Sequence, residues 1–288
     1  MSDKEIFRQL RAARQSGADG FWFGGGEPTT RPDFLKVVRA AKKLGFKKVK
    51  IQTNAMMCAS EDNLDRMIRA GVTEFNVSIK GHNSDIHDAL TQTEGCFDLL
   101  CEATRLMKAK NVPVHGDILL YEENTPYLKE IIQHFEGLGV VHFNLWHLSL
   151  YGADEAQTRD LSQRVPRMAH VAENLVGLGD TTWKNTEPTV TALHLPPCSL
   201  PSSHWHMLFQ AATLGLVVAD PGGHTFRLEQ SPFEGGVYLP RCESCAARDI
   251  CDGLRDDYLK IFGDDEFQAI SGQPVVEIPP KPLLDAQE

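Results

Sequence analysis

The sequence predicts an α/β fold, an incomplete (β/α) barrel followed by an irregular, cysteine-containing C-terminal region. Helical and strand patterns alternate over the first 150 residues with short connections, and parallel strands need such crossover helices. Residues able to do chemistry follow several of the strands, which is where barrels place their working groups. The pattern begins with a helix and not with a strand, so we expect a TIM-like barrel that lacks its first strand.

The elements follow from periodicity. Residues 3–17 form the first predicted helix, because Ile6, Leu10 and Ala13 recur at spacings of three and four. A short buried strand at residues 21–23 then leads into three glycines. Further helices are expected at 32–44, 63–70, 97–110 and 125–138, and further strands at 48–52, 74–79, 112–120 and 140–150.

The pattern changes after residue 150. A helix is expected at 160–178, and residues 179–240 are rich in Pro, Gly, Thr and Ser, with a short apolar run at 214–219. Another short helix is expected around 256–261. The predicted organisation is a partial barrel over 1–150, a C-terminal extension over 151–272 and a flexible tail over 273–288.

Composition narrows the function classes. The net charge of −10 argues against nucleic acid or an anionic membrane as the main partner. We find no apolar stretch of bilayer-spanning length and no secretory signal, so the expected location is the cytoplasm. Thiols stay reduced there, which makes the seven cysteines candidates for metal binding before disulfides.

The word Gly-Gly-Glu-Pro follows the strand at 21–23. Glycines after a strand let the backbone approach a ligand, and Pro28 would fix the turn. The Glu27 carboxylate would suit an ammonium group. A plain glycine turn is the alternative interpretation, because the word is short.

A second signal is the spacing Cys242-x2-Cys245-x5-Cys251. Three thiolates within ten residues can converge on one metal centre, and Cys198 is the natural fourth ligand. A structural zinc site has the same four ligands and remains an alternative. A redox-active Cys242–Cys245 pair is a further alternative, although no thioredoxin-like context surrounds it.

The other cysteines and the histidines carry weaker signals. The isolated cysteines are expected to be small buried residues, namely Cys58, Cys96 and Cys101. His115 and His147 lie on strands expected to line the barrel, and His147 adjoins Trp146 and Asn144 where a substrate pocket could form. The histidines near the cysteine region are expected at the surface, although each could be a ligand or a substrate contact: His194, His204, His206 and His224.

Several of these words together resemble the radical S-adenosylmethionine (radical SAM) enzymes. Gly-Gly-Glu-Pro at 25–28 resembles the family's word after its second strand, and Thr53-Asn54-Ala55 resembles a Thr-Asn-Gly word near its SAM site, with Ala in place of Gly. Further resemblances are Ser78, His87-Asp88 with Gly95, and Asn124. The resemblance covers residues 3–150 and then the C-terminal cysteines, which look like the family's SPASM or twitch extensions.

The resemblance implies a set of ligands and a reaction. SAM would be bound by Gly25, Gly26, Glu27, Pro28, Thr53, Asn54 and Ser78. An auxiliary [4Fe-4S] cluster would be held by Cys198, Cys242, Cys245 and Cys251. Such enzymes reductively cleave SAM and abstract hydrogen from a substrate, here a peptide or a small molecule, with a reductant such as ferredoxin or flavodoxin.

One departure matters. The family's CxxxCxxC motif, which holds the catalytic [4Fe-4S] cluster, does not occur in this sequence, and no cysteine precedes Cys58. We expect that a preceding β unit with this motif has been lost by truncation, and that the chain as given does not cleave SAM without it. The alternative is a non-catalytic SAM-fold binding or scaffold protein with structural zinc or one cluster.

Overall fold

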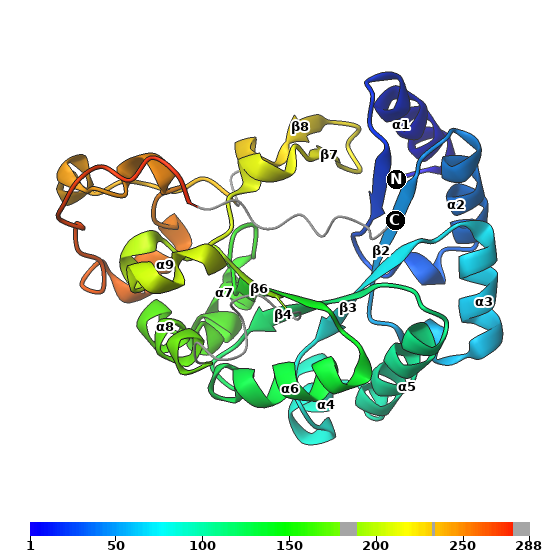
Figure 1. The fold of residues 1–288 in the computed structure, drawn as a ribbon, viewed down its shortest axis with the longest axis horizontal. Helices are drawn as coiled ribbons and strands as arrows, with labels where there is room; N and C mark the ends of the chain where they lie inside the picture. The colour runs from blue at the N-terminus through cyan, green and yellow to red at the C-terminus, as the bar shows by residue number, and fades with distance from the viewer. Residues whose placement is uncertain (179–188, 232–233, 279–288) are drawn as a thin grey trace.

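The computed structural model describes residues 1–178, 189–231 and 234–278. Six strands form one sheet in which every neighbouring pair is parallel and the spatial order is the chain order. The strands are β1 (Gly20–Phe23), β2 (Lys48–Thr53), β3 (Glu74–Ile79), β4 (Val114–Leu120), β5 (His142–His147) and β6 (Thr189–Leu193). The sheet is curved but not closed, with helices along its outer side (Figure 1), which confirms the predicted α/β fold and incomplete barrel.

The predicted helices between these strands are present. They are α1 (Asp3–Gln15), α2 (Phe34–Lys43), α3 (Glu61–Ala70), α5 (Cys96–Ala109) and α6 (Leu128–Leu138). The sequence analysis missed α4 (Ser84–Thr91). Its start is marked by Asn83, whose side chain accepts a hydrogen bond from the Ile86 amide, a common N-cap arrangement.

The two faces of the sheet differ in chemistry. The outer face, under the helices, carries fully buried apolar side chains: Val49, Ile51, Phe75, Val77, Ile118, Leu120, Phe143 and Leu145. The inner face carries polar side chains at the alternate positions: Lys50, Gln52, Glu74, Asn76, Ser78, His115, Asp117, His142 and Asn144. Parallel sheets covered on both faces are usually apolar on both, so a polar inner face indicates a ligand-binding surface.

Past residue 150 the structure departs from the expected single helix. Residues 155–177 form two helices, α7 (Glu155–Leu161) and α8 (Met168–Gly177), separated by a short 3-10 turn. Pro166 explains the break, because it has no amide donor and disfavours helical backbone at the residue before it. Strand β6 pairs with β5, so the sheet extends beyond residue 150. The division into 1–150 and 151–272 stays a prediction, and residues 279–288 of the predicted tail lie outside the described residues.

The C-terminal region contains little regular structure. It has a hairpin of β7 (Val217–Ala219) and β8 (Thr225–Arg227) and one helix, α9 (Asp256–Phe262). The remaining elements of the described chain are 3-10 turns: η1 (Pro28–Thr30), η2 (Met56–Ala59), η3 (Thr125–Tyr127), η4 (Ser162–Arg164), η5 (Pro197–Ser199), η6 (Ser202–Met207), η7 (Ala211–Leu214), η8 (Leu228–Gln230), η9 (Pro240–Ser244) and η10 (Arg248–Ile250).

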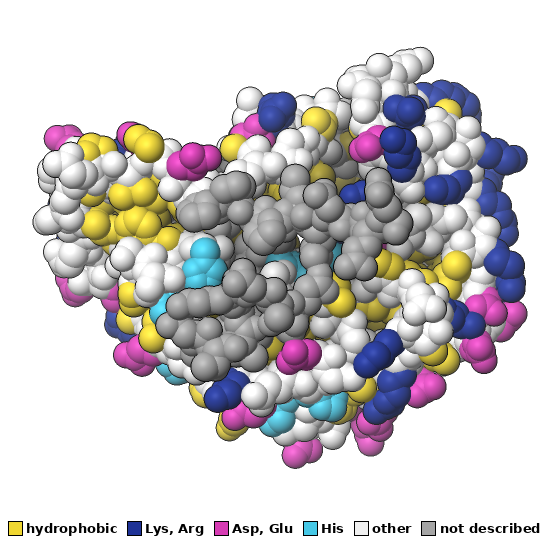
Figure 2. Space-filling view, in the orientation of Figure 1, with side chains coloured by type: hydrophobic (Ala, Val, Ile, Leu, Met, Phe, Trp, Pro, Cys, Tyr) yellow, Lys and Arg dark blue, Asp and Glu magenta, His cyan; other side chains and the backbone are white. Residues whose placement is uncertain are grey.

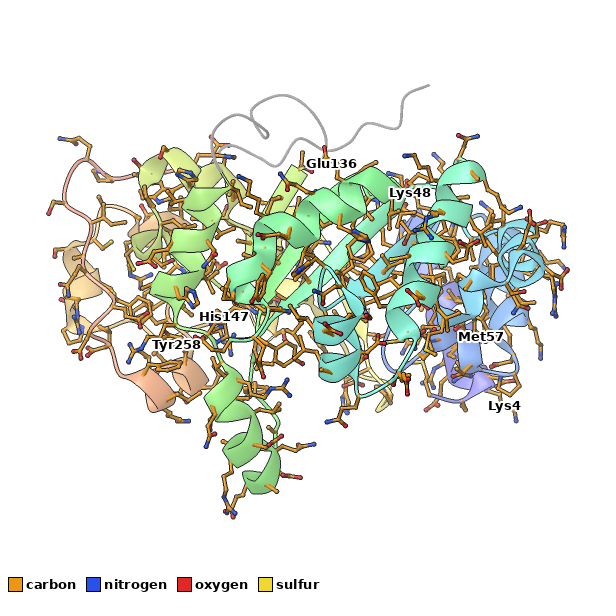
Figure 3. The ribbon with its side chains drawn as sticks, turned by 90° about the horizontal axis from the view of Figure 1, so that it is seen from below. Lys4, Lys48, Met57, Glu136, His147 and Tyr258 are labelled. Atoms are coloured by element: carbon orange, nitrogen blue, oxygen red, sulfur yellow. The ribbon has the colours of Figure 1, made fainter. Side chains whose placement is uncertain are left out.

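Helix α9 anchors this region to the end of β5. The buried Arg255 donates hydrogen bonds to the carbonyl oxygens of His147 and Leu148 and pairs with Asp257. The rings of His147 and Tyr258 pack edge to face with centroids 5.4 Å apart, and the two labelled residues lie close together in Figure 3. These contacts attach a loop-rich region to a rigid sheet.

The surface agrees with the acidic composition only in part. Basic side chains gather over α1 to α3, at the right of Figure 2, whereas a hydrophobic area lies at the left, over the C-terminal region. Among the described residues, no helix is both long enough and apolar enough to cross a membrane.

Candidate functional site

The Glu27 carboxylate lies at the centre of the first candidate site, directly after β1. Its Oε1 atom accepts hydrogen bonds from the Thr29 amide, at 3.0 Å, and from the Thr53 hydroxyl, at 2.8 Å. Its Oε2 atom accepts one from the Asn54 amide at 2.7 Å. The structure thus joins the two words Gly-Gly-Glu-Pro and Thr-Asn-Ala through one half-buried carboxylate, whose Oε2 retains capacity for another donor.

The backbone at Thr53-Asn54-Ala55 explains why glycine suits the third position. Ala55 has a φ of +63°, in the left-handed region that costs a non-glycine residue on the order of 1 kcal/mol. The Asn54 side chain stabilises this turn by accepting a hydrogen bond from the Met56 amide at 3.1 Å. The alanine is therefore tolerated at a position that geometry would assign to glycine.

The glycines leave room beside Glu27. A Cβ atom added at Gly25 or Gly26 would meet nothing within 4 Å, so the space next to the carboxylate is open, while Pro28 is buried and begins the turn. Ser78 is half-buried on the inner face near the end of β3. It lies at the same carboxyl edge of the sheet as Thr53, but no hydrogen bond among the described residues joins it to the Glu27 cluster.

Other residues that carried the resemblance have structural roles. The Asp88 carboxylate accepts hydrogen bonds from the amides of Gly95 and Phe97 and so fixes the start of α5. His87 Nδ1 accepts a hydrogen bond from the Lys80 amide. Asn124 donates to the Lys80 carbonyl. These bonds position the chain just after β3 and β4.

The inner face holds a polar network that the sequence analysis missed, centred on Asp117. This residue is 4% exposed and accepts hydrogen bonds from the side-chain amides of Gln52, Asn76 and Asn144. Burial raises the pKa of the Asp117 carboxyl, and the hydrogen bonds from Asn144 and Asn76 oppose that rise. The amide oxygen of Asn76 is buried and makes no hydrogen bond among the described residues, so it is free to accept one from a ligand.

Lys80 adds a second titratable group beside this network. Burial lowers the pKa of its amine to about 8, while the Asp117 carboxylate acts in the opposite direction. Its ammonium group lies 5.6 Å from the centre of the Tyr121 ring. An amine that loses its proton near neutral pH, close to a buried carboxylate at the carboxyl edge of a sheet, is typical of functional sites.

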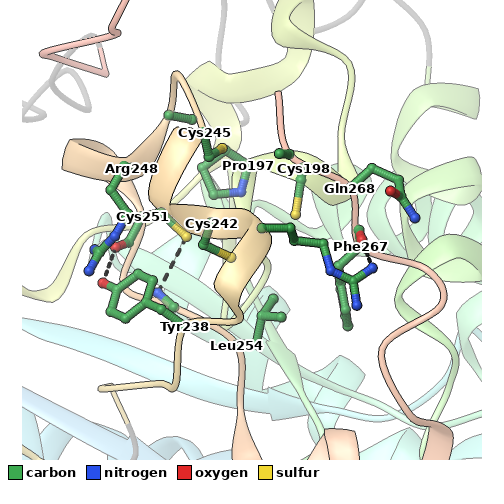
Figure 4. A pocket seen from close by; sticks show the side chains of 14 residues that line it. Pro197, Cys198, Tyr238, Cys242, Cys245, Arg248, Cys251, Leu254, Phe267 and Gln268 are labelled. Carbon is green, nitrogen blue, oxygen red and sulfur yellow. Dashed lines mark hydrogen bonds between the residues drawn. The ribbon is translucent and has the colours of Figure 1, made fainter. Parts of the chain in front are cut away.

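The four predicted metal ligands line the same hollow. Cys198, from the turn after β6, lines one pocket with Cys242, Cys245 and Cys251 (Figure 4). The hollow has about 400 Å³ of empty space, partly open to solvent, and its other walls include Pro197, Leu254 and Phe267. Cys198, which is 44 or more positions from the other three in sequence, thus lines one space with them.

The surroundings of the thiols suit sulfur ligands. The Gly253 amide donates a hydrogen bond to Cys251 Sγ at 3.3 Å, and the Ile270 amide donates one to Cys245 Sγ at 3.3 Å. Burial, followed by the nearby Cys251, Cys245 and Cys242 thiols, raises the pKa of Cys198 to about 12. Amide-to-sulfur hydrogen bonds are one means by which proteins tune iron–sulfur clusters.

Elsewhere the cysteines behave as expected. Cys58, Cys96 and Cys101 are each less than 5% exposed, as predicted for small buried residues.

As the side chains are placed, the described part of the chain contains no group of three or more His, Cys, Asp or Glu residues close enough to hold a single metal ion.

The comparisons with known proteins identify the N-terminal part. Residues 1–135 match the radical SAM superfamily. The AdoMet-dependent heme synthase of Oleidesulfovibrio alaskensis is 28% identical over 128 residues, which cover 44% of this chain and 32% of that protein. This part of the chain is therefore similar to the radical SAM superfamily. Members of the superfamily use SAM and a [4Fe-4S] cluster.

Other relatives of the radical SAM region agree. A probable GTP 3',8-cyclase of Saccharolobus solfataricus is 27% identical over 153 residues, 53% of this chain and 49% of that protein. The chain therefore spans half or less of the length of these relatives. Among solved structures, Streptococcus suis SuiB bound to precursor peptide SuiA has a TM-score of 0.56 at 16% identity, covering 73% of this chain and 48% of that one. SuiB bound to S-adenosylmethionine has a TM-score of 0.50 at 15% identity, covering 61% and 39%. These structural likenesses show the fold.

The strand positions of the radical SAM sheet correct one sequence-based interpretation. His115 faces inward, with Nε2 3.7 Å from Glu74 Oε2. His147 does not lie with Asn144 on the inner face, because successive side chains on a strand point to opposite faces. His147 Nε2 instead lies 2.8 Å from the Pro166 carbonyl oxygen. Burial lowers the pKa of His147 to about 3, which suits its place in the seam with α9.

The same alternation could have revealed the Asp117 network. Gln52, Asn76, Asp117 and Asn144 each alternate with apolar residues on predicted strands, so all four are expected on one face. The sequence analysis weighted motifs and histidines above this pattern. Lys80 carried no signal in the sequence, because its lowered pKa depends on burial.

Proposed function

We propose that this chain is part of a radical SAM enzyme whose catalytic [4Fe-4S] cluster would be held by a CxxxCxxC segment that this sequence does not contain. In this proposal SAM binds at the Glu27 cluster, an auxiliary [4Fe-4S] cluster binds at the four C-terminal cysteines, and the substrate lies against the polar inner face of the sheet. The observation that carries the proposal is the Glu27 carboxylate, which joins both SAM-related words at the carboxyl edge of a sheet whose sequence is similar to the superfamily. If that segment and its reduced [4Fe-4S] cluster were present, SAM bound here would supply a 5′-deoxyadenosyl radical for hydrogen abstraction.

The residues present fit the amino-acid end of SAM. Hydrogen bonds from Thr29, Thr53 and Asn54 fix the orientation of the Glu27 carboxylate, and its Oε2 atom can accept a further hydrogen bond from an ammonium group. The open space at Gly25 and Gly26 would admit the ligand backbone. Thr53, Asn54 and Pro28 shape the turn, and Ser78 would approach the ligand from the next strand.

The cysteine pocket fits an auxiliary cluster. Four thiols are soft ligands of the kind that select iron–sulfur clusters or zinc. Here they line a hollow, and two of the sulfurs accept amide hydrogen bonds. A cluster suits a hollow because each thiolate binds a different iron atom. The domain division at residue 151 and the reductant, ferredoxin or flavodoxin, belong to the same proposal.

A peptide is the substrate class we favour. The SuiB structure that shares this fold is described as bound to precursor peptide SuiA, which supports the choice. The inner face of this chain offers an unpartnered amide oxygen at Asn76 and the buried amine of Lys80. An amide-bearing chain provides both donors for the oxygen and acceptors for the amine.

The test of the SAM site is a calorimetric titration of the purified chain. SAM should bind, and Glu27→Gln should weaken binding by about tenfold or more, because the partner charge of the ammonium group is lost. Binding of 5′-methylthioadenosine, which lacks the amino-acid group, should change little. The matched control is Glu130→Gln, which removes an exposed carboxylate from α6.

Two results would contradict the proposal. The wild-type chain failing to bind SAM, with its sheet intact by circular dichroism, would favour the scaffold alternative. Equal weakening of SAM and 5′-methylthioadenosine by Glu27→Gln would mean that the carboxylate supports the fold of the site and does not pair with the amino group.

A further inference from the structure

A second pocket lies beside the cysteine pocket, and no motif pointed to it. The two pockets share Pro197 and Gly253 in their walls. The second has about 470 Å³ of empty space, partly open to solvent. Its walls combine apolar side chains, among them Leu195, Leu208 and Phe209, with the charged or titratable side chains of His194, Glu234, Asp252 and Arg255. We call it the His194 pocket.

His194 is held in an unusual state. It directly follows β6, with a φ of +65°, in the left-handed region that is strained for a residue with a side chain. Its side chain is only 7% exposed, and neither ring nitrogen makes a hydrogen bond among the described residues. The ring packs edge to face on Trp146, with centroids 5.9 Å apart. Backbone strain and a buried polar ring without hydrogen bonds occur together mainly at functional sites.

The pocket is acidic. The side chain of Glu234 is also 7% exposed, and its Oε2 atom lies 3.5 Å from His194 Nε2. Asp252 lines the same space. The only arginine in the described wall, Arg255, is already engaged by the His147 and Leu148 carbonyls and by Asp257. Among the described residues, two carboxylates therefore line an apolar-walled space without a committed Lys or Arg side chain.

We propose that the His194 pocket binds a basic side chain of the substrate, an ammonium or guanidinium group at the end of an apolar stem. The carboxylates of Glu234 and Asp252 pair with the charge, a ring nitrogen of His194 accepts a hydrogen bond, and Leu195, Leu208 and Phe209 contact the stem. The identification of the cation as part of the substrate rests on the proposed function. Binding of a cation in this pocket does not.

The probes are three capped tripeptides, N-acetyl-Gly-X-Gly-amide, in which X is lysine, norleucine or glutamate. They are titrated into the full chain while the His194 ring protons are followed by NMR, assigned with His194→Gly. The lysine peptide should shift these signals and bind at least about tenfold more tightly than the norleucine peptide. The glutamate peptide should not bind.

Two variants localise the effect. Glu234→Gln should weaken the lysine peptide about tenfold or more, whereas Glu243→Gln, which removes an exposed carboxylate from the neighbouring 3-10 turn, should leave binding unchanged. His194→Gly relieves the strain of the left-handed backbone, so this variant should fold at least as stably as the wild type. It should nevertheless bind the lysine peptide less well, as measured by calorimetric titration.

Several outcomes would overturn the proposal. Equal binding of the lysine and norleucine peptides would show an apolar pocket, and unchanged binding in Glu234→Gln would place the cation elsewhere. Saturable broadening of the His194 signals by Mn²⁺ that excludes the lysine peptide would assign the pocket to a metal. Failure of SAM to bind would count against the proposed function alone, because the peptide titrations need no SAM.

Discussion

The sheet and the cysteine region are stabilised in different ways. The sheet is held by continuous parallel pairing and by an outer face of fully buried apolar side chains under the helices. Beyond Pro197 the described chain has one seven-residue α-helix, a short hairpin and several 3-10 turns. It depends on a few side-chain contacts such as Arg255. The comparison teaches that the proposed SAM site should persist without metal, whereas the cysteine region should depend on its anchor and on the metal ligation proposed for it.

The largest expected effect is on metal content. Cys245→Ser removes one of the four thiols and should abolish the iron–sulfur signal of the C-terminal region, because an incomplete ligand set holds a cluster poorly. Iron and sulfide analysis after anaerobic reconstitution measures it. Cys101→Ala is the control, since that buried thiol lies outside the pocket. Unchanged iron in Cys245→Ser would refute the ligand assignment, and bound zinc in place of iron would favour the structural alternative.

The anchor of the C-terminal region is the next test. Arg255→Met removes a buried guanidinium and leaves Asp257 without its charged partner, so the free energy of unfolding should fall by about 3 to 5 kcal/mol. Urea denaturation followed by Trp fluorescence measures the change. The control, Arg105→Met, removes an exposed pair with Glu102 and should cost less than about 1 kcal/mol. Equal, small losses in both variants would mean that Arg255 is not the anchor.

The smallest effect concerns Lys80 in the sheet. Its native pKa of about 8 lies below the usual value for lysine. Between about pH 8 and pH 10 the unfolded chain therefore keeps a proton that the native chain has released, and this group makes stability rise with pH. Lys80→Met should remove that contribution, on the order of 1 kcal/mol per pH unit. Urea denaturation midpoints measured across this pH range report the contribution of Lys80, and Lys43→Met is the control at an exposed site. Identical dependence of stability on pH in the wild type and in Lys80→Met would contradict a lowered lysine pKa.

Sequence patterns predicted the sheet region well and the site in part. Strand and helix periods located β1 to β5 and most helices, because local alternation reports burial directly. The motifs around Glu27 and the spacing of the cysteines each marked residues that lie near one another in the structure. Helix α4 and strand β6 were missed, since α4 is short and β6 lies in a segment whose composition resembles loops.

What remained hidden depends on long-range packing. Asp117 accepts hydrogen bonds from side chains on three strands, and only the register of the sheet makes those residues neighbours. His194 and Glu234 are 40 positions apart, and no local sequence pattern predicts their contact. His147 was assigned to the wrong face because a one-residue shift along a strand reverses the direction of the side chain.

The strand order has a consequence for how the protein is made. Because each strand of the sheet pairs with the strand that precedes it in the chain, every new β unit emerging from the ribosome finds its partner already in place. Most of the sheet can assemble during synthesis, with each loop closed over a short span of chain. The His147 and Leu148 carbonyls accept their hydrogen bonds from Arg255 only after a further 107 residues have been synthesised. The contacts that anchor the cysteine region therefore form late, after the sheet to which they attach.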